Sequence, residues 1–188
     1  MTAIIDRIYQ LTIECIKGCY IQTCIVALTA GLISLFAVKG RNPLKIFGDF
    51  VWSSLMAGYL TLLAYGTFLE RTLGFRREVC LIPFHIFLNW DYEKVFIIGN
   101  FLLFMPFGIL FAVKSGKVWR VMCASIVLST AIEVSQYIFS VGKSEVDDII
   151  LNTAGAVLVA IPVVLIRRIA AKTRGSNPPR ATARESIF

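Results

Sequence analysis

The chain has 188 residues, of which 57% are hydrophobic and 16% are charged, and its mean hydropathy is +0.74. Soluble globular domains are roughly 45 to 50% apolar and about 25% charged, so this composition excludes that class and indicates a membrane protein. The length gives room for one compact helical bundle but not for a second folded domain. With a formal net charge of +7, we expect membrane lipids as partners and no nucleic acid.

The first predicted element is an amphipathic helix from Thr2 to Cys19. Isoleucine and leucine side chains recur there at helical spacing, and charged and polar side chains occupy the other face. We expect this helix to lie in the membrane interface. A cleavable signal peptide is disfavoured, because the segment contains acidic residues and lacks a small-residue cleavage site.

Five apolar stretches follow, each of about 18 to 23 residues and long enough to cross a hydrocarbon core of about 30 Å. They cover residues 20–38, 50–69, 95–113, 118–140 and 149–166. The predicted fold class is therefore all-α, a polytopic helical membrane bundle of about five transmembrane helices plus the N-terminal interfacial helix. Residues 1–170 form the predicted transmembrane domain. Residues 171–188 form a disordered basic tail against anionic headgroups.

The distribution of Lys and Arg predicts the orientation of the bundle. Twelve of the 19 basic residues lie in the loop Lys39–Asp49, the turn Lys114–Arg120 and the C-terminal tail, whereas seven lie on the other side. By the positive-inside rule, the C-terminus of this multi-pass cell-membrane protein is cytoplasmic.

The loop from Glu70 to Lys94 is too apolar for an aqueous connection. Its centre reads Val-Cys-Leu-Ile-Pro-Phe-His-Ile-Phe-Leu from Val79 to Leu88. Irregular backbone at membrane depth needs cover from protein or a wet cavity. We therefore expect the loop to dip into the outer leaflet and to cap polar groups beneath it.

The third span contains an amide and a helix breaker. Asn100 lies near its start, and a buried amide needs hydrogen-bonding partners. Pro106 removes a backbone hydrogen bond and predicts a kink near mid-membrane. Pro106 and Gly108 are also consistent with a role in helix packing alone.

The fourth span carries a polar stripe along one helical face. Its members lie at i, i+4, i+7 and i+11, namely Ser129, Glu133, Gln136 and Ser140. The carboxylate of Glu133 is about 10 Å below the interface, where a charge costs at least about 2.5 to 3.5 kcal/mol. It therefore needs partners, and the candidates are Asn100, Asn152 and Arg77.

The fifth span opens with a second polar face at i, i+3 and i+7, formed by Glu145, Asp148 and Asn152. Gly155 follows on this face and would let a neighbouring backbone approach closely. Acidic residues in a first turn also suit the positive end of the helix dipole. Asp147 is better interpreted as such a cap, whereas Asp148 fits a cap and a functional site equally well.

Consecutive spans run antiparallel, so these polar positions of the third, fourth and fifth spans lie on one side of the membrane. The sequence therefore predicts an outward-facing polar pocket on the extracytoplasmic side. No metal and no other cofactor is expected, because CxxC pairs are absent and the single histidine, His85, has no thiol at ligand spacing.

Four sequence elements occur in order between Arg77 and Ala156. They are Arg77 with Cys80, Pro83 and Phe84; Asn100 with Pro106, Phe107 and Gly108; Glu133 with Gln136; and Glu145 with Asp148, Asn152, Thr153 and Gly155. Together they resemble the VanZ-like family of membrane proteins. The chain departs from the family pattern at Cys80, where the family has Asn, and at Glu145, where it has Asp.

The predicted residues fall into two sets. The pocket or ligand-binding set is Arg77, Asn100, Glu133, Gln136, Glu145, Asp148 and Asn152. The structural set is Pro83, Phe84, Pro106, Gly108 and Gly155. The resemblance implies an envelope role and, for the family's namesake, low-level resistance to the lipidated glycopeptide teicoplanin.

Three functions remain open at this level. In the first, the pocket binds a lipid-linked wall precursor or a lipoglycopeptide without catalysis. In the second, Glu133 and Asp148 act as the general acid and base of an intramembrane enzyme whose substrate is a headgroup. In the third, the polar groups only hold the helices together. No nucleophile lies beside a base, which disfavours an enzyme. Interhelical polar contacts average only about 0.6 kcal/mol, which disfavours a purely structural network, and no visible repeat supports transport.

Overall fold

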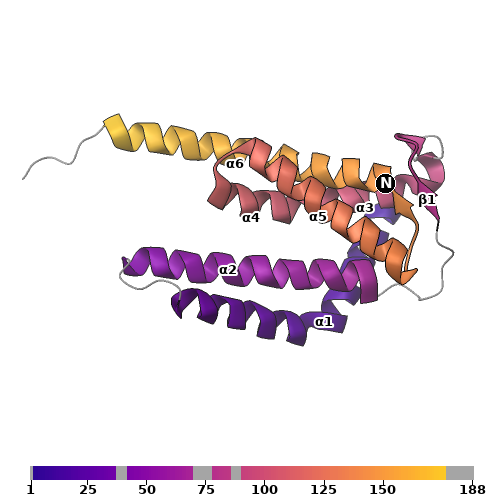
Figure 1. Cartoon of the computed structure of the whole chain (residues 1–188), viewed down its shortest axis with the longest axis horizontal. Helices are drawn as coiled ribbons and strands as arrows, with labels where there is room; N and C mark the ends of the chain where they lie inside the picture. Colours follow the sequence, from indigo (N-terminus) through magenta and orange to yellow (C-terminus); the bar gives the residue numbers. More distant parts are fainter. Residues whose placement is uncertain (1, 37–41, 70–77, 86–89, 177–188) are drawn as a thin grey trace, which may run out of the picture.

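The computed structural model describes residues 2–36, 42–69, 78–85 and 90–176 (Figure 1). Its elements in chain order are α1 (Thr2–Phe36), α2 (Pro43–Ala64), the π-helical turn η1 (Tyr65–Leu69), β1 (Val79–Cys80), α3 (Trp90–Leu103), α4 (Met105–Ser115), α5 (Val118–Phe139), β2 (Ser144–Glu145) and α6 (Val146–Ser176). The predicted all-α class is confirmed, and two short strands are added to it.

Five helical segments of the described chain are long and apolar enough to cross a membrane, as predicted. They cover Cys19–Phe36, Pro43–Phe68, Lys94–Ser115, Val118–Phe139 and Val146–Thr173. The second begins earlier than expected, because the Asn42 side chain accepts a hydrogen bond from the Leu44 N–H and Pro43 opens the helix.

The last helix is longer than the sequence suggested. α6 continues to Ser176, so residues 171–176, the first part of the predicted tail, are helical. Alanine, lysine and arginine after Ile169 are strong helix formers, which explains the extension. The rest of the predicted tail, residues 177–188, lies outside the described residues.

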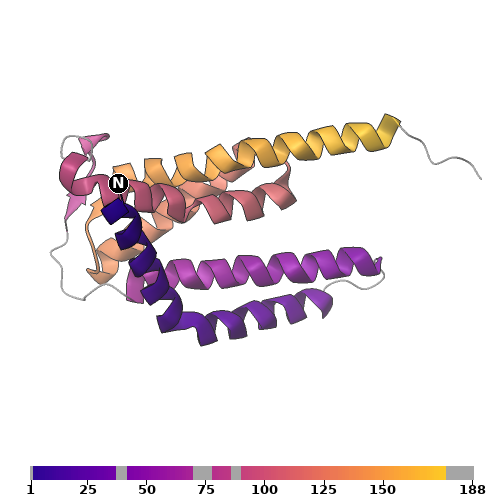
Figure 2. The same ribbon diagram turned by 180° about the vertical axis from the view of Figure 1, so that it is seen from behind.

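The helices form two groups, α1 with α2 and α3 with α4, α5 and α6 (Figure 1). α1 is a single helix through the boundary expected near Cys19, but it bends strongly, and its N-terminal part runs towards α3 (Figure 2). The interfacial position of that part stays a prediction.

The third span is broken at Phe104, as the proline predicts. α3 ends at Leu103 and α4 begins at Met105, so Pro106 falls in a first turn where a missing N–H costs little. Tyr59 of α2 donates its hydroxyl to the carbonyl of Leu103 at 2.9 Å. A side chain from α2 therefore holds the end of α3 at the break.

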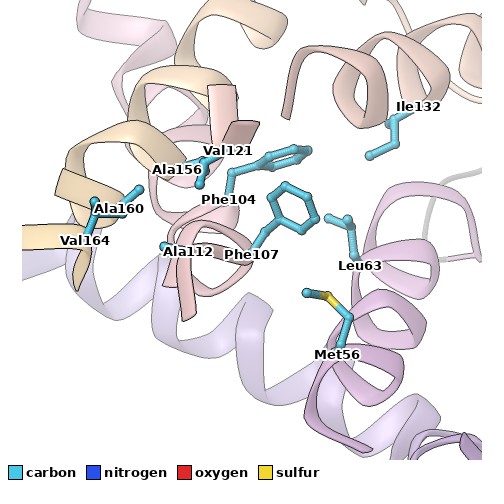
Figure 3. Close-up of a cluster of buried hydrophobic side chains, with 10 residues drawn as sticks. All are labelled: Met56, Leu63, Phe104, Phe107, Ala112, Val121, Ile132, Ala156, Ala160 and Val164. Carbon is cyan, nitrogen blue, oxygen red and sulfur yellow. The ribbon is translucent and has the colours of Figure 1, made fainter. Parts of the chain in front are cut away.

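The hydrophobic core is built around this break (Figure 3). Phe104 is fully buried and meets Phe107 edge to face, with ring centroids 5.9 Å apart. Buried side chains from three other helices belong to the same cluster, namely Met56, Leu63, Val121, Ile132, Ala156, Ala160 and Val164.

Two glycines allow the broken span to approach α6 closely. A Cβ atom at Gly155 would overlap the carbonyl oxygen of Phe101, and one at Gly108 would overlap the backbone of Ala156. The close approach expected at Gly155 is therefore present, and a second lies at Gly108. These contacts fix the position of α6 against α3 and α4.

The two strands form a short parallel pair that the sequence did not predict. Val79 pairs with Ser144 and Cys80 with Glu145, and the Ser144 N–H donates to the Glu78 carbonyl at 3.0 Å. The described part of the apolar loop, residues 78–85, is thus joined to the turn between α5 and α6. We call residues 78–85 the capping segment.

Candidate functional site

Polar residues of α3, α5 and α6 lie at the end of the bundle where β1 and β2 pair (Figure 1). The start of α3, the end of α5 and the start of α6 meet there, as antiparallel spans require. Hydrogen bonds at this end join Asn100 to Asp148, Asn152 to Ser129, and Glu133 to the backbone of Glu145.

Glu133 of α5 is a buried acidic residue at this end of the bundle. It is 6% exposed, and its Oε2 accepts a hydrogen bond from the Glu145 backbone N–H at 3.0 Å. Ser144 donates its hydroxyl to the Glu133 carbonyl at 2.7 Å. The turn after α5 therefore folds back and supplies a backbone hydrogen-bond donor to a buried carboxyl group.

The side chains expected to compensate Glu133 make other contacts. The amide nitrogen of Asn100 donates to Asp148 Oδ1 at 2.5 Å, and that of Asn152 donates to the hydroxyl of Ser129 at 2.9 Å. Asn100 thus joins α3 to α6, and Asn152 joins α6 to α5. Arg77 lies outside the described residues.

Asp148 therefore does more than cap a helix, since it accepts a side-chain hydrogen bond from another span. Gln136 makes a further connection, because its Nε2 donates to the carbonyl of Thr67 in η1 at 3.4 Å. The predicted stripe of α5 is buried at Ser129, Glu133 and Gln136 and half-buried at Ser140.

Some buried acceptors of this region have no hydrogen-bond partner among the described residues. They include Oε1 of Gln136, Oδ1 of Asn152 and the hydroxyl of Ser125, and all three residues are buried. Buried polar atoms are usually satisfied, and in a membrane they are expensive and are most often functional. The buried faces of α5 and α6 therefore have spare capacity for hydrogen-bond donors.

Asp147 anchors the capping segment. It is 3% exposed, and its Oδ1 accepts a hydrogen bond from the Phe84 N–H at 2.5 Å. Phe84 follows Pro83 in a turn and has a positive φ of 65°, a conformation that bulky residues rarely adopt. The interpretation of Asp147 as a simple cap therefore misses its contact with the capping segment.

A groove opens beside Glu133, between α5, the capping segment and the start of α6. It has a volume of about 300 Å³. Its apolar lining includes Val79, Leu81, Val134, Val146 and Ile149, and its polar lining consists of Thr130, Glu133, Tyr137, Ser144 and Glu145. One acidic residue of the buried stripe thus also lines an apolar groove.

Lys143 modifies the charge at the end of this groove. Its ammonium group lies 2.6 Å from Glu145 Oε1, and this hydrogen bond raises the pKa of Lys143 above its ordinary value. Lys143 stays protonated at neutral pH and offsets part of the negative charge of Glu145. Within the described residues, no group of three or more His, Cys, Asp or Glu side chains could hold a metal ion.

The sequence did not single out Thr67, Ser144 or the β1–β2 pairing. A threonine in an apolar helix gives little signal, because its hydroxyl usually bonds to the preceding turn, as Thr67 does with the Leu63 carbonyl at 2.7 Å. Ser144 was detectable only as the neighbour of Glu145. Pairing between two-residue strands so far apart in the chain leaves no periodic pattern.

Replacing Asp147 with Ala is expected to loosen the capping segment. The change removes the acceptor of the Phe84 N–H, and a lost hydrogen bond of this kind costs about 1 to 3 kcal/mol. We expect faster hydrogen exchange of the backbone amides in residues 79–85, with little change in the spans. Asp147→Asn, which retains an oxygen acceptor, is the matched control, and equal exchange in all three proteins would contradict the assignment.

The chain is similar to known proteins over more than half of its length. Residues 50–167 match the VanZ/LLP1 family. The chain is also similar to Protein VanZ from Enterococcus faecium, with 27% identity over 133 residues that cover 70% of each chain. No solved structure matches the chain. The family match covers more than half of the chain, and the described residues include five helices suited to membrane spanning, so this protein belongs to the VanZ/LLP1 family of membrane proteins.

Proposed function

We propose that the protein binds the lipid-bearing part of an envelope molecule, a lipid-linked wall precursor or a lipoglycopeptide such as teicoplanin, in the groove beside Glu133. Binding changes how such molecules are presented at the cell surface and so contributes to glycopeptide resistance. The protein acts in this proposal by binding, without a catalysed step.

The observation that supports the proposal is the combination of an apolar groove with two carboxylates. The groove has a volume of about 300 Å³, which is at the lower limit for ligand pockets, roughly 300 to 1,000 Å³. A groove of this size fits part of a ligand, such as a segment of acyl chain. The apolar side chains of Val134 and Ile149 suit that segment.

The two carboxylates suit the polar part of such a ligand. An ionised carboxylate accepts several hydrogen bonds and donates none, so Glu133 and Glu145 favour amide N–H, hydroxyl and ammonium groups. Peptide and sugar portions of lipid-linked molecules carry such donors. Oε1 of Gln136 and Oδ1 of Asn152 are further acceptors deeper in the bundle.

The distribution of charge supports an extracytoplasmic site. The opposite end of the bundle carries a concentration of basic residues, namely Lys114, Lys117, Arg120, Arg167, Arg168 and Lys172. Under the positive-inside rule that end is cytoplasmic. The groove beside Glu133 then opens on the outer leaflet, where wall precursors and glycopeptides are found.

A pair of tryptophan variants tests the proposal with purified protein in lipid nanodiscs. Val134→Trp fills the groove, whereas Ile138→Trp places the same bulk one turn further along α5, at a side chain that is 57% exposed and outside the groove. We expect fluorescent teicoplanin to bind saturably to wild type and to Ile138→Trp, and at least tenfold more weakly to Val134→Trp. Unsaturable or equal binding in all three proteins would sink the proposal.

The same preparation tests the enzymatic alternative. Incubation with labelled envelope lipids would yield a product that disappears in both Glu133→Gln and Asp148→Asn if the two acids shared catalysis. The hydrogen bonds described for Glu133 and Asp148 involve different partners, Glu145 and Asn100. This arrangement favours binding, so we expect no product.

A further inference from the structure

A second groove lies far from Glu133, at the basic end of the bundle. It is formed by the start of α5 and the C-terminal half of α6 and has a volume of about 510 Å³. It lies near the ends of two membrane-spanning helices, and therefore at the depth where a bilayer changes from acyl chains to headgroups.

The walls of this groove are apolar and face outward from the bundle. Trp119 is 57% exposed, Ile161 50% and Leu165 55%, and Val164 closes the floor as a buried core residue. From Ile161 to Arg168 the groove follows α6 for about 10 Å, at 1.5 Å per residue. In a membrane, an open apolar channel of this shape lies against acyl chains.

Positive charge is concentrated at one end of the groove. Lys117 and Arg168 line it, and both side chains are exposed. Lys117 is also the N-cap residue of α5, whose first turn has no side-chain cap, so the positive end of the helix dipole adds to the two cations. The adjacent Arg167 is engaged elsewhere, because its guanidinium donates to the Ala112 carbonyl at 3.1 Å.

We propose that this groove binds one anionic phospholipid. The phosphate lies between Lys117 and Arg168 at the start of α5, and one acyl chain lies along Ile161 and Leu165. Trp119 occupies the headgroup level, where tryptophan is enriched in membrane proteins. Charge complementarity selects an anionic lipid over a zwitterionic one, because the cation of a choline headgroup would be placed among like charges. Binding here is independent of what occupies the groove beside Glu133.

Native mass spectrometry of the full-length protein, titrated with phosphatidylglycerol or phosphatidylcholine, tests this site. We expect phosphatidylglycerol to be retained preferentially. Removing one basic residue from a membrane surface weakens binding about fivefold, so Lys117→Gln with Arg168→Gln should weaken phosphatidylglycerol binding about 25-fold and abolish the preference for it over phosphatidylcholine.

The matched control for Arg168→Gln alone is Lys172→Gln, which removes the same single positive charge one turn beyond Arg168 on α6 and outside the groove. We expect it to retain phosphatidylglycerol as wild type does. An equal loss in Lys172→Gln would overturn the proposal, because it would show general attraction to basic helix ends. Equal binding of the two lipids by wild type would also overturn it.

Two further measurements separate the groove from its charges. Leu165→Trp fills the apolar channel and leaves both cations in place, so it should lower phosphatidylglycerol binding. It tests the same site independently of whether the double variant folds. Glycerol phosphate carries the phosphate without acyl chains and should not compete. Undiminished lipid binding by Leu165→Trp, or competition by glycerol phosphate, would contradict a lipid site.

Discussion

Replacing Glu133 with Gln is expected to abolish teicoplanin resistance in cells while the protein still folds and reaches the membrane. Glutamine has nearly the same shape as glutamate, and its amide oxygen can still accept the hydrogen bond from the Glu145 N–H. Only the charge is lost. Hydrogen bonds to charged groups contribute about 1.5 to 3 kcal/mol, so ligand binding should weaken roughly 10- to 100-fold.

The measurement compares minimum inhibitory concentrations of teicoplanin and vancomycin in a susceptible host that expresses wild type or the variant. We expect wild type to protect against teicoplanin more than against unlipidated vancomycin, and Glu133→Gln to lose that difference. Immunoblotting of membranes establishes that the two proteins are present in equal amounts.

Asp49→Asn is the matched control, since it makes the same chemical change at the opposite end of the bundle. Asp49 forms an ion pair with Lys114, and exposed pairs contribute little to stability, so resistance should be unchanged. Full resistance in Glu133→Gln would refute a binding role for the charge. Loss of the Glu133→Gln protein from the membrane would instead indicate that the carboxylate is a scaffold.

The membrane fold was largely predictable because its main determinants are local in sequence. Each span is a long apolar run, and a bilayer requires such a run to be helical. Pro106 predicted the break of the third span, since a proline removes a helical hydrogen bond wherever it occurs. Gly155 predicted a close approach, although the sequence could not say that its neighbour would be the Phe101 carbonyl.

For the polar stripe of α5 the sequence predicted burial but not contacts. Helical periodicity placed Glu133 and Gln136 on one face, and both are buried. The donor to Glu133, however, is the backbone N–H of Glu145, and every residue except proline carries such a group. Side-chain patterns cannot reveal which one folds back onto α5.

The capping segment illustrates the same limit. Its apolar composition predicted that it would lie against polar groups, but its attachment depends on an N–H of Phe84 meeting Asp147. The acidic residue looked like a helix cap because caps and anchors use the same residue types at the same positions. The two roles differ in which backbone N–H the carboxylate accepts from, and here the donor, Phe84, is 63 residues away from Asp147 in the sequence.

Replacing Gly155 with Ala is expected to destabilise the bundle. The added Cβ would overlap the Phe101 carbonyl oxygen, a backbone atom that cannot rotate away. Either α6 must move outward or α3 must shift. Overpacking of this kind costs about 1 to 3 kcal/mol and sometimes more.

The shift would also reach the polar end of the bundle, because Asn152 lies one turn before Gly155 and donates to Ser129 of α5. We therefore expect Gly155→Ala to lower the unfolding temperature in detergent and to lower teicoplanin binding together. Gly99→Ala on α3 is the matched control, since a Cβ there meets nothing within 4 Å and alanine favours helix by up to about 1 kcal/mol. Unfolding of both variants at the wild-type temperature would contradict this prediction. It would show that the tight crossing of α3 and α6 does not position Asn152, and that helix packing is not connected to the binding site.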